Sequence, residues 1–415
     1  MAAKLNIFMV GGRRCGKTTV LSRVYRQFNS VLKHDEPGEK DLFLLNAQAQ
    51  DIPHIRDAEN AIHAIFNDHD CYDEFIVEDY NPSQTMSEIR FSLQPTEGSS
   101  PLEVGFRDIP GEWCSGRSVD GQEMVTATGI DGSEQTKNPL EFVKDYIKVS
   151  TVTMIAIDTP AMMEVNGAFN DTINRIGPIT EAFKSIVETG GDENIMDKLI
   201  LFVPLKCEKY VVNGDGTIDN EGMKRVTQRV KESYKELIEF IGRTPLNESV
   251  SAAILPIVTI KEVLWAKYGC FWEGERSRIY NDQGRPRIFP KFYDAKNLVY
   301  SYFSFRNDSL FDEALENGAK SQFCEQPLVY SLVYSMNHYL YRKQHPAKVK
   351  RSGIFGKLLE WFEALSQTIA KYLNAIFNLY EGNCDFKKEA ERLSRSKMIR
   401  RNGFEIIQDK RNLLG

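Results

Sequence analysis

Lys4-Leu-Asn-Ile-Phe-Met-Val10 leads directly into Gly11-Gly-Arg-Arg-Cys-Gly16-Lys17-Thr18-Thr19, and this stretch decides the fold. The first segment has the apolar run of a buried strand, and the second fits G-x-x-x-x-G-K-[ST]. Apolar residues then recur at helical spacing, at Val20, Leu21, Val24, Tyr25 and Phe28. A strand, a glycine-rich loop and a helix in this order form a phosphate-binding loop, so the sequence predicts an α/β nucleotide-binding protein.

The residues of this loop have separate expected roles. Its glycines allow backbone N–H groups to close around phosphates at the positive end of the following helix. Lys17 is expected to reach the β- and γ-phosphates, and Thr18 to ligate magnesium. The loop residues predicted to bind the nucleotide are Gly11, Gly12, Arg13, Arg14, Cys15, Gly16, Lys17, Thr18 and Thr19.

A phosphate-binding loop also needs an acidic group at the end of a neighbouring strand. Leu102-Glu-Val-Gly-Phe-Arg-Asp108 supplies one. Asp108 is predicted to be the carboxylate on the magnesium side of the site. Three residues later, the backbone N–H of Gly111 is placed to sense a γ-phosphate, and Asp-x-x-Gly is the switch element of GTPases. The alternative is that Asp108 only ends its strand at a turn.

The segment before this strand is predicted to pair with it. Residues 88–95 read as a strand that turns through residues 96–100 and pairs with residues 102–108 in an antiparallel hairpin. Thr85 lies just before this hairpin and is the candidate for a second hydroxyl ligand to magnesium. Ser83 stands beside it, and hydroxyl residues are frequent in polar loops, so an ordinary loop residue is an equal alternative.

The base-recognition segment is expected after the strands at 151–158 and 198–204. Many GTPases carry N-K-x-D there, where the lysine stacks along the base and the carboxylate reads guanine. In Leu205-Lys206-Cys207-Glu208, Lys206 is kept, Glu208 stands for the aspartate, and leucine replaces the asparagine. The last strand, at 252–259, is expected to place Thr259 beside the base, with ordinary packing at the strand end as the alternative.

These motifs occur in the order 11–18, 108–111, 205–208 and 257–260, and in this order the chain resembles the TRAFAC-type P-loop GTPases. The resemblance covers roughly the first 340 residues. It implies a doubly wound, mostly parallel sheet with one antiparallel hairpin strand, which binds Mg-GTP at its carboxyl edge.

Shorter segments resemble two groups within this class. Asp-Ile-Pro-Gly-Glu-Trp, at residues 108–113, is similar to the switch of YcjX-like GTPases. Pro256-Ile-Val-Thr259 and Cys324-Glu-Gln-Pro-Leu328 are similar to segments of the double-GTPase proteins of bacterial conflict systems. The second resemblance implies a role in bacterial defence.

Two features of the motifs bear on catalysis. Glu112 stands after the switch glycine, where many GTPases carry the glutamine that orients the attacking water. A carboxylate there orients or polarises water, but it also repels the γ-phosphate, so hydrolysis is expected to be slow unless a cation compensates. Arg13 and Arg14 are candidates for that cation, acting in cis as an arginine finger acts in trans. The alternative is that they point to solvent or to a partner.

The remaining chain is expected to extend this domain, which we place at residues 1–342. Residues 30–84 exceed what a switch loop requires and include a helical pattern, so we predict a helical insertion. Residues 261–342 are rich in aromatics, include a predicted hairpin around 281–284, and end in a helical pattern that closes the domain. Core packing is the favoured interpretation of the aromatics, with a ligand platform as the alternative.

Residues 343–415 are predicted to be a basic, helical C-terminal region. From Arg342 onward we count 16 lysines and arginines against 8 acidic residues, in a chain whose net charge is −6. Within it, residues 353–380 show a heptad pattern expected to dock on another helix. We therefore expect a protein partner to bind this helix or the 30–84 insertion. The basic tail is expected to contact an anionic membrane or a nucleic acid. An oligomer of the chain is a further alternative.

Composition places the chain among globular proteins. Hydrophobic residues make up 42%, charged residues 27% and aromatics 11%, which excludes collagen-like, disordered and disulfide-scaffold classes. The seven cysteines form no C-x-x-C pair. The longest clean apolar runs, such as 199–203, are too short to cross a membrane, and the first residues lack the core of a signal peptide, so a cytoplasmic location is expected.

The expected function is a magnesium-dependent GTPase that hydrolyses GTP to GDP and phosphate and acts as a switch on a protein partner. Leu205 and Glu208 weaken the argument for guanine, so an ATPase or ATP-binding enzyme is one alternative. A scaffold that binds the nucleotide without turnover is another.

Overall fold

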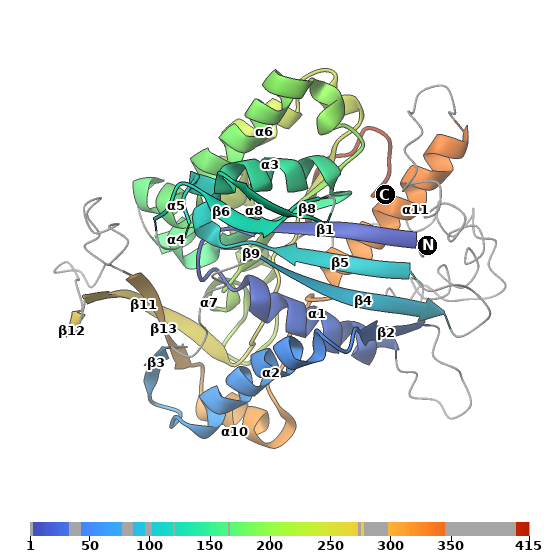
Figure 1. Cartoon of the computed structure of the whole chain (residues 1–415). Helices are drawn as coiled ribbons and strands as arrows, with labels where there is room; N and C mark the ends of the chain where they lie inside the picture. The colour runs from blue at the N-terminus through green and yellow to red at the C-terminus, as the bar shows by residue number, and fades with distance from the viewer. Residues whose placement is uncertain are drawn as a thin grey trace.

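A computed structural model describes residues 3–32, 43–76, 86–95, 102–118, 121–130, 132–164, 167–272, 275–277, 298–344 and 404–414. Its centre is an eight-stranded mixed sheet (Figure 1). From one edge to the other, the strands are β14 (Glu405–Gln408), β10 (Ser251–Ile254), β9 (Leu199–Leu205), β8 (Val152–Asp158), β1 (Ala3–Gly11), β5 (Leu102–Asp108), β4 (Ser87–Pro95) and β2 (Phe43–Ala47).

The five strands from β10 to β5 are parallel, and the outer pairs β5–β4, β4–β2 and β10–β14 are antiparallel. This confirms the predicted α/β class, the doubly wound, mostly parallel sheet and the antiparallel pairing of residues 88–95 with 102–108. Every residue of β8 and β9 is buried, as expected for central parallel strands that helices cover on both faces.

Helices cover both faces of the sheet, with α3 and α6 on one face and α1 and α11 on the other (Figure 1). The α-helices are α1 (Lys17–Leu32), α2 (Ile52–Asn67), α3 (Pro139–Val149), α4 (Thr159–Glu164), α5 (Gly167–Asn174), α6 (Ile176–Gly190), α7 (Glu208–Val211), α8 (Asn220–Ser233), α9 (Lys235–Ile241), α10 (Asp308–Asn317) and α11 (Gln326–Gln344). Three single-turn helices are η1 (Gly111–Ser115), η2 (Asp192–Asn194) and η3 (Leu246–Glu248).

A smaller second sheet and a separate hairpin complete the fold. The second sheet has the order β12 (Glu275–Ser277), β11 (Val263–Trp272), β13 (Leu298–Phe305) and β3 (Glu74–Ile76). The hairpin pairs β6 (Val125–Thr128) with β7 (Glu134–Lys137). Aromatic side chains of the second sheet pack on α2 and α10, where the rings of Phe66, Phe305 and Phe311 lie within 5.9 Å of one another. Of the aromatics in the 261–342 segment, Trp265, Tyr268, Tyr302 and Phe305 are buried in core, as predicted, while Phe303 is half-buried. Residues 281–284 lie outside the described residues.

The segment at 30–84 contains the predicted helix, α2, and two strands that the sequence did not predict. β2 extends the main sheet beyond β4, and β3 pairs with β13 of the second sheet. The inserted segment is therefore not purely helical, because its two strands complete separate sheets. Residues 33–42 and 77–85 lie outside the described residues.

The end of the chain also differs from the expectation of a helical tail. Residues 405–408 form β14, which pairs with β10 and places Leu413 and Leu414 in the core at 1% and 0% exposure. The 353–380 heptad segment and most of the basic region lie outside the described residues. In the part of the chain that the structure describes, no helix is long and apolar enough to cross a membrane.

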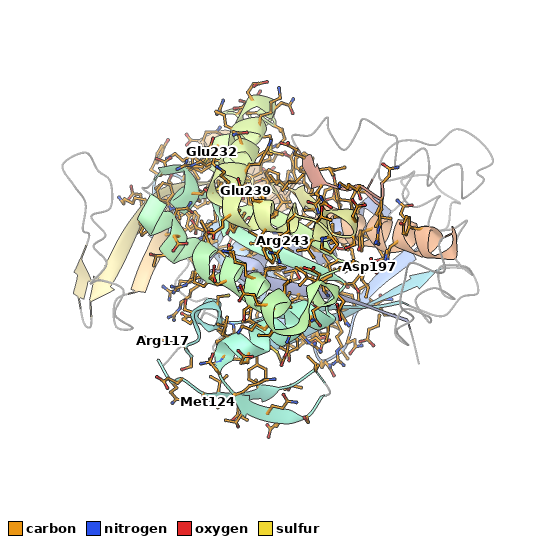
Figure 2. The ribbon with its side chains drawn as sticks, turned by 90° about the horizontal axis from the view of Figure 1, so that it is seen from above. Arg117, Met124, Asp197, Glu232, Glu239 and Arg243 are labelled. Carbon is orange, nitrogen blue, oxygen red and sulfur yellow. The ribbon has the colours of Figure 1, made fainter. Side chains whose placement is uncertain are left out.

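Polar contacts fix this last segment. Arg411 forms an ion pair with Asp197, the residue labelled near α11 in Figure 2, and Nε2 of His338 lies 3.7 Å from the same carboxylate. Burial alone would raise the pKa of Asp197, but His338 and Arg411 lower it to about 2. The stability that this carboxylate contributes is therefore present above its ordinary pKa of 3.8 and is lost as the pH falls toward 2.

If residues 404–414 complete the sheet, Leu414→Ala should lower the free energy of unfolding by about 2–5 kcal/mol, because it leaves a cavity in the core. Chemical denaturation measures this change. Lys410→Ala is the matched control, because Lys410 is exposed and loses only a surface ion pair with Glu248. Equal effects of the two substitutions would contradict the docked position of the segment.

Candidate functional site

The loop after β1 adopts a conformation that its glycines make possible. A Cβ atom on Gly11 would lie 2.4 Å from the carbonyl oxygen of Ala156, and one on Gly12 would lie 1.8 Å from that of Ile173. Gly16 has φ +103°, a conformation that residues with a side chain rarely adopt. The loop is thus held against β8 and α5, and its close approach to both requires glycine.

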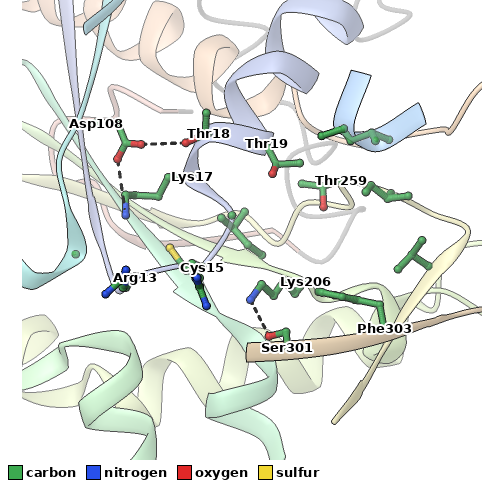
Figure 3. A pocket seen from close by; sticks show the side chains of 18 of the residues that line it. Arg13, Cys15, Lys17, Thr18, Thr19, Asp108, Lys206, Thr259, Ser301 and Phe303 are labelled. Carbon is green, nitrogen blue, oxygen red and sulfur yellow. Dashed lines mark hydrogen bonds and ion pairs between the residues drawn. The ribbon is translucent and has the colours of Figure 1, made fainter. Parts of the chain in front are cut away.

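Lys17 and Thr18, at the start of α1, meet Asp108 at the end of β5. Nζ of Lys17 donates to the carbonyl oxygens of Gly11 and Gly12, at 3.4 and 3.1 Å, and lies 3.7 Å from Oδ1 of Asp108. Oγ1 of Thr18 donates to Oδ2 of Asp108 at 3.3 Å (Figure 3). The sequence-predicted lysine, hydroxyl and carboxylate are therefore brought together.

Burial and charge act on this group in opposite directions. Burial raises the pKa of Asp108, while Lys17 and the Thr18 hydroxyl lower it, and the net shift is upward. Burial would lower the pKa of Lys17, but Cys15 and Asp108, and then Cys114 and Glu112, raise it above the ordinary value. Lys17 is therefore cationic near neutral pH and suited to bind a phosphate.

The segment after β5 lies directly on the loop. A Cβ atom on Gly111 would lie 2.3 Å from the backbone nitrogen of Arg13. In this arrangement Nη1 of Arg13 lies 3.0 Å from Oε1 of Glu112, and both side chains are about four-fifths buried, with 21% and 15% of their surface exposed. Arg13 therefore does not point to solvent but pairs with the predicted water-orienting residue. Arg14 has φ 58° and lines a cavity together with Arg13 and Lys17.

A second buried lysine–aspartate pair lies on the other side of the loop. Nζ of Lys206, just after β9, donates to Oδ2 of Asp158 at 2.8 Å and to Oγ of Ser301 at 3.0 Å. The hydroxyl of Tyr268 and the backbone N–H of Ala161 both donate to Oδ1 of Asp158, at 2.5 and 3.1 Å. The amine predicted to lie along the base is thus held by the second sheet and by the end of β8.

The hydrogen-bond network of Asp158 continues into helices α5 and α8. The side chain of Asn174 accepts from the backbone N–H of Asp158 at 2.6 Å and donates to its carbonyl at 3.1 Å. Asn170 accepts from Asn174 at 2.8 Å and donates to Ser233 at 3.0 Å. These contacts fix the backbone at the end of β8, and so they fix the position of the Asp158 carboxylate.

Glu208 contacts the loop after β10 rather than open space. Its Oε1 accepts from the backbone N–H and the hydroxyl of Thr259, at 2.8 and 2.9 Å, and from the N–H of Ile260 at 3.2 Å. Burial raises the pKa of Glu208 against the effect of these hydrogen bonds. The structure therefore brings Glu208 and Thr259 together, with one carboxylate oxygen already engaged.

Both lysines, Asp108, Glu112, Glu208 and Thr259 line one cavity, which is open to solvent and measures about 1220 Å³ with its mouth. Lys17 and Thr18 lie at one end, and Lys206 and Phe303 lie toward the other (Figure 3). Apolar side chains of α2 and the second sheet add to its wall, among them Ile62, Ile65 and Val263. A polar end next to an apolar end suits a ligand with a charged group and a flat, less polar group.

The residues at the polar end fit a magnesium ion. Oδ1 of Asp108 is buried without a hydrogen-bond partner, 3.7 Å from Nζ of Lys17, and Oδ2 accepts from the hydroxyl of Thr18. Carboxylate and hydroxyl oxygens are the ligands that magnesium prefers, with phosphate oxygens and water completing its shell. The described residues contain no group of three or more His, Cys, Asp and Glu side chains that would hold a metal without such a ligand. Thr85, the other predicted hydroxyl, lies outside the described residues.

Sequence analysis did not identify Asp158, Tyr268, Ser301 or Asn174 as parts of the site. Asp158 carries one usable signal, because it ends a buried strand of a parallel sheet at the edge where ligands bind. Tyr268 and Ser301 carry none, because they belong to an aromatic-rich segment whose fold the sequence did not reveal. Comparison with known protein families finds none that matches the sequence, and a search of curated proteins finds no match either.

If Asp158 and Lys206 form one buried unit, Asp158→Asn and Lys206→Met should each lower the free energy of unfolding by about 3 kcal/mol. The double variant should lose less than the sum, with a coupling of about 1–3 kcal/mol measured by chemical denaturation. The control is Asp158→Asn combined with Lys224→Met, because Lys224 is exposed on α8 and its effect should add. Strict additivity of the first pair would contradict the assignment.

Proposed function

We propose that the chain binds a nucleoside triphosphate together with Mg²⁺ and hydrolyses it to the diphosphate and phosphate, with GTP as the preferred substrate. The observation that carries the proposal is the convergence of Lys17, Thr18 and Asp108 around a glycine loop at the carboxyl edge of the parallel sheet. In this fold, that edge beside a helix N-terminus is where phosphate groups bind.

The residues at the polar end divide the work of phosphoryl transfer. Lys17 would exchange its carbonyl partners for phosphate oxygens and stabilise the charge that spreads over the γ-phosphate. Thr18 and Asp108 would hold magnesium, which supplies charge neutralisation when it is bound. The backbone N–H of Gly111 and the loop amides would orient the phosphates for in-line attack by water.

Glu112 and Arg13 are the candidates for activating this step. A carboxylate near the γ-phosphate can accept a proton or a hydrogen bond from the attacking water. Its repulsion of the phosphate is offset by the positive charge of the neighbouring Arg13 guanidinium. Arg13 then contributes positive charge in cis, as an arginine finger would do in trans. Arg14 is the second candidate for this role.

The base would lie at the end of the cavity near Lys206 and Phe303. The residues there support guanine less directly than the residues around Lys17 support a triphosphate. Lys206 lines the cavity near Phe303, which suits a stacked base. Oε1 of Glu208, however, already accepts three hydrogen bonds from Thr259 and Ile260. This observation favours ATP as the alternative substrate, because adenine needs no carboxylate to read its ring.

We propose that nucleotide turnover switches the chain between two states that act differently on a protein partner, in the manner of the conflict-system GTPases that the chain resembles. Helix α2 is placed to relay the state of the nucleotide site to a partner. Its Ile62 and Ile65 line the cavity, and the 30–84 segment to which it belongs adds β2 and β3 to separate sheets. The 353–380 segment and the basic tail are further candidate contacts, the tail for an anionic surface. A cytoplasmic location and an oligomer belong to the same proposal.

Lys17→Ala should abolish magnesium-dependent phosphate release, because it removes the amine that holds the β- and γ-phosphates. The measurement compares GTP with ATP on the purified chain, with and without EDTA, and Lys224→Ala serves as the matched surface control. Faster release from GTP supports the guanine assignment, and faster release from ATP supports the alternative.

Two results would count against this site. Unchanged hydrolysis in Lys17→Ala would place the activity elsewhere or in a contaminant. Tight, magnesium-dependent binding of GTP that persists for hours without phosphate release would instead identify a nucleotide-gated scaffold.

A further inference from the structure

The ion pair between Arg13 and Glu112 joins the phosphate-binding loop to the segment after β5. Nη1 of Arg13 and Oε1 of Glu112 lie 3.0 Å apart, and both residues line the cavity at the end that holds Lys17. The pair therefore stands where the γ-phosphate of a bound triphosphate would lie under the proposed function. A diphosphate, which lacks this group, would leave the pair undisturbed.

Each partner keeps unused hydrogen-bonding capacity on a buried atom. Nε of Arg13 and Oε2 of Glu112 are both buried without a hydrogen-bond partner. Buried polar atoms in folded proteins are nearly always satisfied, so this pair of atoms points to a ligand and a water that bind here. A phosphate oxygen suits Nε of the guanidinium, and a water proton suits the carboxylate oxygen.

The backbone around the pair leaves little freedom to move. Gly111 lies so close to the loop that a Cβ atom would meet the backbone nitrogen of Arg13 at 2.3 Å. Trp113 is 2% exposed, and its ring packs 5.5 Å from the ring of Phe142 on α3. Since residues on both sides of Glu112 are fixed, a change at this pair is confined to its side chains.

We propose that the Arg13–Glu112 ion pair selects triphosphates over diphosphates, because a γ-phosphate displaces Glu112 from Arg13. The guanidinium then binds the γ-phosphate, and the released carboxylate turns its free oxygen toward the attacking water. Arg13 and Glu112 thus determine specificity for the γ-phosphate in addition to their part in hydrolysis. This inference rests on the proposed function, because it requires that the loop bind nucleotide phosphates.

The electrostatic balance supports the exchange. A γ-phosphate brings more negative charge than one carboxylate, so it competes for the guanidinium and repels Glu112 at the same time. The pair is about four-fifths buried, so displacing it has a cost that the contacts of the γ-phosphate must offset. The new contact between a guanidinium and a phosphate is charge-assisted and is the stronger of the two.

The test measures binding of GDP and of a non-hydrolysable GTP analogue by isothermal titration calorimetry in magnesium. Arg13→Gln should weaken binding of the analogue by about tenfold or more and change GDP binding by less than about threefold. Arg13→Lys should restore part of the loss, because it keeps the charge without the fork of the guanidinium. Glu112→Gln should strengthen binding of the analogue by about threefold, because no carboxylate competes for Arg13.

Glu221→Gln is the matched control, because it breaks an exposed ion pair with Lys224 on α8, and it should leave both affinities unchanged. Thermal unfolding of each variant verifies that the chain is folded. Equal weakening of both nucleotides by Arg13→Gln, or weaker binding of the analogue by Glu112→Gln, would overturn this inference alone. If the wild-type chain binds neither guanine nor adenine nucleotides, the proposed function fails and the inference fails with it.

Discussion

Two lysine–aspartate pairs flank the glycine-rich loop after β1. The pairing of β1 with β5 positions the first, and the pairing of β8 with β9, which sets Asp158 opposite Leu205, positions the second. The parallel register sets Met9 opposite Asp108 and Gly11 opposite Ala156, so the two neighbouring strands end beside the loop. Lys17 then faces Asp108 on one side, and Lys206 faces Asp158 on the other. A buried carboxylate without its cation is costly, so the register and the two pairs stabilise each other.

This constraint draws the second sheet into the site. Asp158 accepts hydrogen bonds from Tyr268 of β11 and from Lys206, which also donates to Ser301 of β13. β13 pairs in turn with β3, at the end of the described part of the 30–84 segment. The end of the cavity near Lys206 and the inserted segment are therefore parts of one hydrogen-bonded structure.

The sequence predicted those features that depend on local order along the chain. The strand, loop and helix from Lys4 to Phe28 follow from residue spacing, and Asp108 follows from its position at the end of the predicted strand at 102–108. The contact between Tyr268 and Asp158 spans 110 residues, and that between Ser251 and Asp409 spans 158. Such contacts depend on how the elements assemble, and neither a spacing nor a propensity in one segment records them.

The two departures from N-K-x-D become intelligible in the assembled fold. Leu205 lies 3.8 Å from the place that a Cβ on Gly16 would occupy, so an apolar contact with the loop stands where an asparagine would make polar ones. Glu208 is one methylene longer than aspartate, and its carboxylate contacts Thr259 and Ile260. Both substitutions direct the segment after β9 toward holding neighbouring loops. In this chain the segment after β9 therefore organises the end of the cavity that Lys206 and Phe303 line.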